Sequence, residues 1–197
     1  MQEGDIERLT TSIARLPGMG TRSANRLVLH LLRNKNSIFR KVIEDLQVVY
    51  QNTSVCSICG NIDTLSPCSI CQDKKRDKKT ICVVSDVTDV WSIERASFYR
   101  GLYHVIGGKL SAIDGVTPAD LNVDQLRERI ETTEVDEVII AMSADIDGQT
   151  TMHFINNAIK DIDINITTLA CGMPIGGELE NLDDGTIMTA FNQRKGI

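Results

Sequence analysis

The chain has 197 residues, 42% of them hydrophobic and 24% charged, and its formal net charge is −6 at neutral pH. This composition is typical of a globular protein with one large domain or two small ones. The acidic, amphipathic N-terminus excludes a signal peptide, and no apolar run approaches the roughly 20 residues needed to span a bilayer. We therefore expect an intracellular, cytoplasmic protein with no membrane partner.

Charge is unevenly distributed along the chain. Residues 1–53 contain eight Lys and Arg against five Asp and Glu, residues 54–80 contain five against three, and residues 81–197 contain eight against nineteen. A basic N-terminal region on an acidic body favours an anion-binding role for that region, although compositional scatter explains such a split equally well.

Residues 5–33 show two stretches of helical periodicity separated by a glycine-containing turn. The turn, residues 16–20, ends the first helix, and Thr21 or Ser23 is expected to cap the second. The predicted apolar stripe of the second helix consists of Ala24, Leu27, Val28, Leu31 and Leu32. A third helix is predicted at about residues 37–50.

The glycine turn has the form of a helix-hairpin-helix motif. Gly18 and Gly20 permit a tight turn that exposes backbone N–H groups at the positive end of the second helix, where phosphate oxygens bind. Arg22 and Arg26 are four residues apart and share one helix face, and Arg33 lies two turns beyond Arg26. The motif predicts DNA binding without reading of bases. The alternative is an ordinary helical hairpin with solvated arginines.

Four of the six cysteines form a compact group. Cys56, Cys59, Cys68 and Cys71 make two Cys-x-x-Cys pairs separated by eight residues. In a chain without an export signal this spacing predicts one structural Zn²⁺, held by four thiolates and closed to water. Iron–sulfur ligation is the remaining alternative. Cys82 is expected to be a buried strand residue, and the spacing assigns no role to Cys171.

From residue 80 onward, short apolar strands alternate with helices. Strands are predicted at residues 81–85, 103–106, 138–142 and 164–169, and helices at residues 87–97, 121–132, 150–160 and 184–193. This alternation predicts a mostly parallel sheet with helices on both faces.

Acidic residues follow two of the predicted strands. Asp86 comes after residues 81–85, and Asp145 and Asp147 come after residues 138–142. Because the carboxyl ends of parallel strands meet at one edge of a sheet, these carboxylates are candidates for a Mg²⁺ site or an acidic partner site. Solvated loop carboxylates are the alternative. No catalytic residue is assigned, and His104 is expected to be packed or hydrogen-bonded.

Four segments, in this order, resemble the RecR family of bacterial recombination mediators over essentially the whole chain. They are residues 16–26 in the glycine turn, residues 56–71 with the cysteines, the motif from Tyr103 to Pro118, and the glycine-rich segment at residues 172–180.

The resemblance implies an α/β fold in four parts. These are a helix-hairpin-helix DNA-binding region (1–53), a four-cysteine zinc finger (54–78), a Toprim-type, Rossmann-like parallel-sheet domain (79–174) and a short C-terminal helical segment for oligomerisation (175–197). It places the DNA-contacting positions on Arg22 and Arg26 and the zinc ligands on the four grouped cysteines.

The resemblance also implies a biological role. It implies a ring-shaped homotetramer that encircles DNA, with RecO and RecF proteins as partners. Such a protein is not an enzyme but a nucleoid-associated mediator of DNA repair, which with RecO helps load recombinase onto single-stranded DNA.

The chain departs from the family pattern in the acidic segments. The first Toprim strand usually ends in Glu, whereas here Val84 is followed by Ser85 and Asp86, and the usual Glu-Gly-Glu appears as residues 147–149, Asp-Gly-Gln. These changes weaken an inherited Mg²⁺ site and favour partner binding. Two other functions stay open, a Mg²⁺-dependent Toprim nuclease or primase-like enzyme and a zinc-stapled protein-interaction hub without a DNA role.

Overall fold

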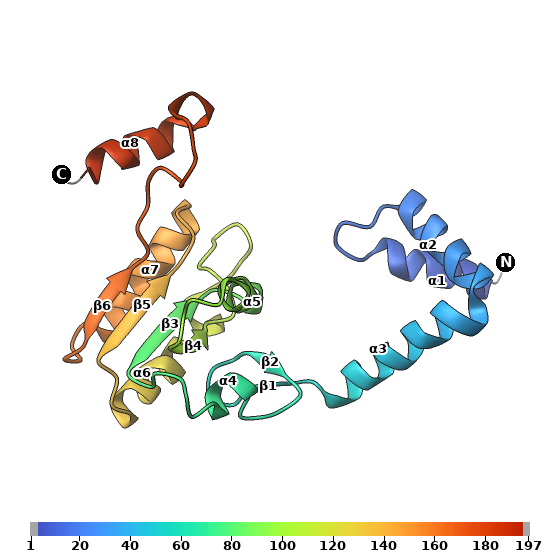
Figure 1. The fold of residues 1–197 in the computed structure, drawn as a ribbon, viewed down its shortest axis with the longest axis horizontal. Coiled ribbons are helices and arrows are strands. Elements are labelled where there is room, and N and C mark those ends of the chain that lie inside the picture. The colour runs from blue at the N-terminus through green and yellow to red at the C-terminus, as the bar shows by residue number, and fades with distance from the viewer. Residues whose placement is uncertain (1–3, 195–197) are drawn as a thin grey trace. The chain divides into compact units, whose positions relative to one another are not determined.

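The computed structural model describes residues 4–194; the ends of the first and last predicted domains, residues 1–3 and 195–197, lie outside the described part. The chain divides into two units, Met1–Thr53 and Ser54–Ile197. We describe each unit by itself (Figure 1).

Within the described residues of the first unit, all the regular secondary structure is helical. It contains α1 (Asp5–Ala14), α2 (Thr21–Arg33), a π-helical turn η1 (Lys35–Phe39) and α3 (Arg40–Asn52). The residues of α2 that are buried are Ala24, Val28 and Leu31. The predicted stripe is therefore wrong at Leu27, which is 37% exposed because it lies on the flank of that row.

The predicted caps of α2 are also wrong. The N-cap is Gly20, in extended conformation, and no side chain caps the helix. Thr21 and Ser23 lie inside the first turn of α2, because the extended backbone of Gly20 already ends the turn that precedes the helix. The N-terminus of α2 is consequently left without a side-chain hydrogen-bond acceptor.

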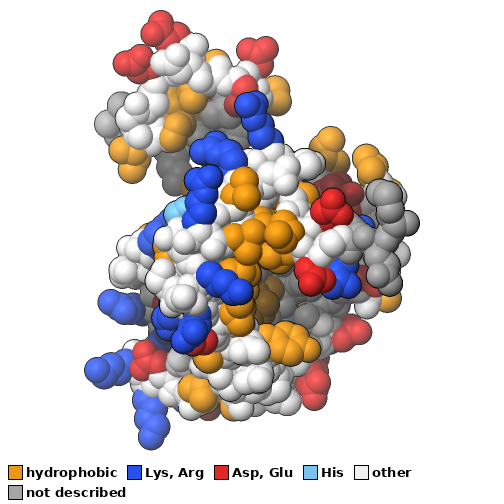
Figure 2. Space-filling view, turned by 90° about the vertical axis from the view of Figure 1, so that its right-hand side faces the viewer, with side chains coloured by type: hydrophobic (Ala, Val, Ile, Leu, Met, Phe, Trp, Pro, Cys, Tyr) orange, Lys and Arg blue, Asp and Glu red, His pale blue; other side chains and the backbone are white. Residues whose placement is uncertain are grey.

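Helix α3 has no buried residue in this single chain. Its exposed large hydrophobic side chains, together with that of Ile38 in η1, belong to Val42, Ile43, Leu46, Val48, Val49 and Tyr50. Figure 2 shows that hydrophobic side chains are exposed at the surface of the protein, with Lys and Arg side chains near some of them. A helix that is amphipathic yet unburied has an apolar face that is available to a partner.

The second unit begins with three very short elements that hold the cysteines. They are the antiparallel pair β1 (Ser54–Val55) and β2 (Ile62–Asp63), followed by α4 (Ser69–Gln72). Elements of two to four residues are too short to give a periodic pattern, so they were not predicted from the sequence.

A four-stranded parallel sheet forms the centre of the second unit, as predicted. The strands β3 (Thr80–Val84), β4 (Leu102–Val105), β5 (Glu137–Ala141) and β6 (Asn165–Thr168) lie in the order β4-β3-β5-β6. Helix α5 (Val87–Ala96) packs on one face, against Cys82 and Tyr103. Helices α6 (Val123–Thr132) and α7 (Ile146–Ile159) cover the other face through the larger core cluster.

Helix α7 begins at Ile146, four residues earlier than predicted. Asp145 is its N-cap and accepts a hydrogen bond from the backbone N–H of Gly148 at 2.6 Å. Gly148 lies so close to the preceding loop that an added Cβ would be 2.2 Å from the carbonyl oxygen of Ser143. The low helix propensity of glycine explains why this first turn was not predicted.

The C-terminal segment follows β6 and contains the 3₁₀ turn η3 (Leu179–Asn181) and helix α8 (Asp184–Asn192). Helix α8 has no buried residue, and Ile175, Met188 and Phe191 are exposed. Among residues 4–194, none of the helices combines the length and the hydrophobicity that a bilayer crossing requires.

Candidate functional site

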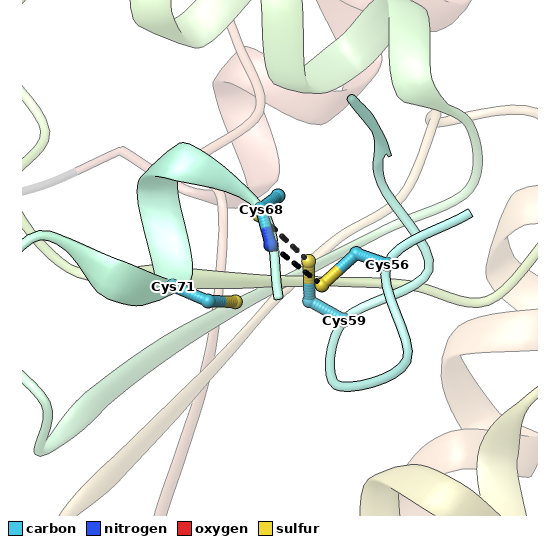
Figure 3. A group of neighbouring side chains, drawn as sticks. All are labelled: Cys56, Cys59, Cys68 and Cys71. Carbon is cyan, nitrogen blue, oxygen red and sulfur yellow. Dashed lines mark hydrogen bonds between the residues drawn. The ribbon is translucent and has the colours of Figure 1, made fainter. Parts of the chain in front are cut away.

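The four grouped cysteines converge on one point. The sulfur atoms of Cys56, Cys59, Cys68 and Cys71 all lie within 4.8 Å of one another. The Sγ atoms of Cys59 and Cys68 are 3.6 Å apart, and the backbone N–H of Cys68 donates to Sγ of Cys56 at 3.3 Å (Figure 3). Three of the four side chains are buried and Cys71 is half-buried.

Local backbone geometry brings each cysteine pair together. Between Cys56 and Cys59 the chain turns tightly, with the N–H of Gly60 bonded to the carbonyl of Cys56 at 3.0 Å and the N–H of Cys56 bonded to the carbonyl of Asn61 at 2.7 Å. Gly60 has φ of 75°, which a residue with a Cβ rarely adopts. Cys68 is the N-cap of α4, and Cys71 lies one turn later on the same helix.

Hydrogen bonds between the sulfurs shift their pKa values in opposite directions. The pKa of the Cys59 thiol is raised far above its ordinary value, first by its hydrogen bond with Cys68 and then by further hydrogen bonding and burial. The pKa of Cys68 is lowered because its sulfur accepts these hydrogen bonds. Four thiolates gathered in a largely buried cluster require a cation, and a tetrahedral set of four sulfurs is the donor set that Zn²⁺ prefers in structural sites.

The cysteine segment is attached to the parallel-sheet domain at two places. The backbone N–H of Val105, at the end of β4, donates to the carbonyl of Cys59 at 2.7 Å. The side chain of Gln125, on α6, donates to the carbonyl of Ser57 at 2.9 Å. The first Cys-x-x-Cys turn therefore forms part of the surface of the domain that follows it.

The basic residues predicted in the glycine turn are all solvent-accessible. Gly18 has φ of 75°, as the tight turn requires, and Arg22 and Arg26 are exposed on α2. Arg26, His30 and Arg33 line one hollow of about 580 Å³, together with Met19 and Ser23. His30 was not predicted from the sequence, although its position four residues after Arg26 places it on the same face.

The acidic residues after β3 and β5 are held by local hydrogen bonds. Asp86 is the N-cap of α5 and accepts from the N–H of Thr88 at 2.8 Å. Asp145 accepts from the ammonium group of Lys109 at 2.6 Å, and the same ammonium group donates to the hydroxyl of Ser143 at 3.1 Å. Lys109, which was not predicted from the sequence, thus lies in the acidic crevice.

The charges around Lys109 agree with this placement. Hydrogen bonding to Asp145 raises the pKa of Lys109, and the charges of Asp145, Asp147 and Asp89 add to the effect. The pKa of Asp145 is lowered to about 2, first by Lys109 and then by the N–H of Gly148. A lysine ammonium group therefore takes the place that a cation would need beside these carboxylates.

A magnesium site does not fit this arrangement. Within residues 4–194, the cysteine group is the only set of three or more His, Cys, Asp or Glu side chains gathered closely enough to hold a metal ion. The structure does not bring Asp86, Asp145 and Asp147 together as a ligand set, because two of them cap different helices.

Two buried residues behave as predicted. Cys82 is 3% exposed and belongs to the core cluster beneath α5, and this burial raises its pKa to about 12. His104 is fully buried, and its Nε2 lies 2.9 Å from the carbonyl oxygen of Asn122. Burial lowers the pKa of His104 to about 4, which keeps the imidazole neutral near pH 7.

Family models match nearly the whole chain. The RecR helix-hairpin-helix model matches residues 6–49, the RecR four-cysteine zinc finger domain matches residues 53–73, and the RecR C-terminal model matches residues 172–195. Between the finger and the C-terminal segment, the Toprim domain matches residues 79–170.

Curated bacterial relatives are similar over their full length. The chain is 47% identical to the recombination protein RecR of Erythrobacter litoralis, with 100% of both chains covered. It is 48% identical to RecR of Bradyrhizobium sp., with 96% of both chains covered. Identity to RecR of Anaplasma phagocytophilum is 44%, with 96% of this chain and 98% of the relative covered.

Removal of the metal is expected to unfold residues 54–73 and to weaken hydrogen bonding at the end of the neighbouring strand β4. Cys68→Ser, or chelation of the wild type, should abolish binding of one Zn²⁺ per chain. The segment should then unfold, because structural zinc contributes roughly 10–16 kcal/mol to modules of this kind. Metal analysis with hydrogen exchange would measure this, and the amide of Val105 should exchange faster because it loses its acceptor on Cys59. Cys171→Ser, which replaces an exposed thiol outside the group, is the control. Full protection of residues 54–73 in metal-free protein would refute the assignment.

Replacement of Lys109 is expected to open the acidic crevice to divalent cations. In the wild type, Mn²⁺ should not broaden the amide NMR signals of residues 85–89 and 143–149, whereas Lys109→Met should allow broadening because a positive charge is removed beside Asp145. Lys160→Met, which removes an ammonium group that contacts Asn157 outside the crevice, is the matched control. Equal broadening in wild type and Lys109→Met would contradict the interpretation.

Proposed function

Because this chain belongs to the RecR family of recombination proteins, we propose that it is a DNA-binding scaffold of recombinational repair that binds without catalysing a reaction. The observation that supports this most directly is the hollow on α2 lined by Arg26, His30 and Arg33, beside an uncapped helix N-terminus.

DNA binding through α2 follows from two features of the first unit. The first N–H groups of α2 have no side-chain acceptor, and they point, with the positive end of the helix dipole, to the turn at Gly18 and Gly20. Arg22 and Arg26 add cationic side chains within the first two turns. Neither feature selects a base, so we propose that the protein binds the sugar-phosphate chain irrespective of sequence.

The zinc finger has a structural role in this proposal. Cys56, Cys59, Cys68 and Cys71 hold one Zn²⁺, which keeps residues 54–78 folded between the DNA-binding region and the Toprim domain (79–174) of the sequence. All four ligand positions come from the protein, so the metal has no position open for a substrate.

The acidic crevice is proposed as a partner site rather than a metal site. Asp89, Asp145 and Asp147 lie around Lys109, and such a mixed-charge surface suits contact with another protein better than coordination of Mg²⁺. We propose the RecO and RecF proteins as partners and loading of recombinase onto single-stranded DNA as the outcome, in the bacterial cytoplasm at the nucleoid. The Mg²⁺-dependent nuclease or primase receives no support from this geometry.

Self-association is proposed to assemble several basic hairpins. Helix α3 exposes an apolar face in the single chain, Leu46 being 64% exposed, and α8 at residues 184–192 exposes Met188 and Phe191. A second copy is the occupant that fits, because the acidic body of each chain repels DNA and a ring collects the basic regions of several chains around one duplex. The proposed state is a homotetramer, with residues 175–197 as a second contact.

Arg22→Ala with Arg26→Ala is expected to weaken binding to all DNA sequences alike. The plot of log affinity against log salt concentration should become less steep by about two units of slope, since each lost phosphate contact removes about 0.9 from the magnitude of the slope. Fluorescence anisotropy at several salt concentrations measures both quantities. Arg8→Ala removes an arginine of the same unit that is already paired with Asp5 at 2.6 Å, and it is the control. Unchanged affinity in the double variant would show that these arginines of α2 do not contact DNA.

Leu46→Asp is expected to dissociate the assembly and to weaken DNA binding with it. The substitution places a charge in the apolar face of α3 but leaves the arginines of α2 intact. Sedimentation velocity with and without DNA measures both effects. Glu44→Gln on the same helix, a polar exchange at an exposed position, should retain both properties. Monomers that bind DNA as tightly as the wild type would argue against the ring.

A further inference from the structure

A pocket apart from the acidic crevice and the hollow on α2 lies between the cysteine segment and α6, and the zinc ligand Cys71 is among its lining residues. Its volume is about 800 Å³. The walls come from Ser57 and Ile58 of the first cysteine turn, from Ile81 and Leu102 of the sheet, and from the exposed side of α6. Aliphatic side chains thus form one part of the lining, and no aromatic ring lines the pocket among the described residues.

Arg129 is the notable side chain of this pocket. It is only 9% exposed, and its single hydrogen bond within residues 4–194 runs from Nη1 to the carbonyl oxygen of Tyr103 at 2.7 Å. No Asp or Glu among residues 4–194 forms a salt bridge with the guanidinium group of Arg129. A guanidinium group has five N–H donors, and a buried charge without a counter-charge is unfavourable.

The unused donors of Arg129 are not sealed inside the protein. The buried side-chain atoms that lack a partner in the described residues are Oδ1 of Asn61 and Nδ1 of His104, and no atom of Arg129 is among them. Since Arg129 lines the pocket, we infer that a ligand in the pocket can reach these unused donors.

The rim of the pocket is balanced in charge. Besides Arg129, its charged lining residues are Lys78, Lys79, Glu128 and Glu134. Lys79 is already paired with Asp136 at 3.0 Å. This rim does not attract a polyanion, whereas the single buried guanidinium group at the wall is suited to one carboxylate, which it can bind through two parallel hydrogen bonds.

We propose that this pocket binds a peptide segment of a partner protein that presents an aliphatic side chain next to a carboxylate group. The aliphatic group packs against Ile58, Ile81 and Leu102, and the carboxylate accepts hydrogen bonds from Arg129. A nucleotide is a poorer fit because the lining has no ring on which a base can stack and the rim carries two carboxylates.

The experiment uses the zinc-loaded full chain and two fluorescein-labelled hexapeptides, Gly-Ser-Gly-Ser-Ile-Leu with a free C-terminal carboxylate and the same peptide with a C-terminal amide. Anisotropy titrations are expected to show saturable binding of the carboxylate peptide and about tenfold weaker binding of the amide. This comparison requires no substitution in the protein, so it does not depend on the folding of a variant.

Two variants then locate the binding. Arg129→Gln should weaken the carboxylate peptide about tenfold and abolish its preference over the amide, since the charged hydrogen bonds are lost. Ile58→Ser, on the partly exposed rim, should weaken both peptides. Arg95→Gln, which removes an exposed arginine of α5 outside the pocket, is the matched control. Zinc content and thermal unfolding of each variant establish that it is folded.

Three results would overturn the proposal. These are no binding of either peptide to the wild type, equal binding of the carboxylate and amide forms, or hydrogen-exchange protection confined to residues that do not line the pocket. A different result would assign the pocket to nucleic acid instead. In that case an oligothymidine would displace the peptide from the wild type and would bind more weakly to Arg129→Gln. Because Arg22 and Arg26 take no part, a failure here leaves the proposed DNA surface on α2 untouched.

Discussion

The gathering of four sulfurs within 4.8 Å is the constraint on which the middle of this chain depends. Residues 54–73 contain two-residue strands and a four-residue helix, and their only core cluster is made of the cysteines and Ile70. Hydrophobic burial cannot fold so small a segment, so a metal has to supply the missing free energy. The same fold places the carbonyl of Cys59 against Val105 and the carbonyl of Ser57 against Gln125 of α6, so the binding surfaces beside the finger depend on the metal as well.

The two units meet their hydrophobic requirements in different ways. In the second unit the parallel sheet buries both its faces, with α5 on one side and α6 and α7 on the other. In the first unit only Ala24, Val28 and Leu31 are buried among the described residues, and α3 leaves its apolar face in solvent. A helical unit with so little core is marginal as a single chain. The proposed association with further copies would therefore stabilise the fold of the DNA-binding region as well as collect its charge.

The elements that could be predicted were those with a long-range pattern. The strands, the order of β and α elements and the parallel sheet follow from periodicity, and the cysteine spacing anticipated a convergent group of sulfurs. Local capping was less accessible, because Gly20 caps α2 where a hydroxyl was expected and Asp145 starts α7 before its apolar stripe begins. The roles of the Lys109 and Arg129 side chains could not be predicted from the sequence. Each owes its position to tertiary contacts over 26 to 36 residues, which no spacing rule encodes.

Lys109 also helps to explain how a Toprim fold can be part of the proposed non-catalytic scaffold. In this topology the carboxyl ends of β3 and β5 are adjacent, and acidic side chains placed there are suited to hold a divalent cation. In this chain Ser85 follows β3, and Asp145 is engaged both as a helix cap and as the partner of the Lys109 ammonium group. A covalently attached cation cannot be exchanged for a metal that activates water or a phosphate. In the proposed role, the crevice serves as a surface of mixed charge that another protein binds.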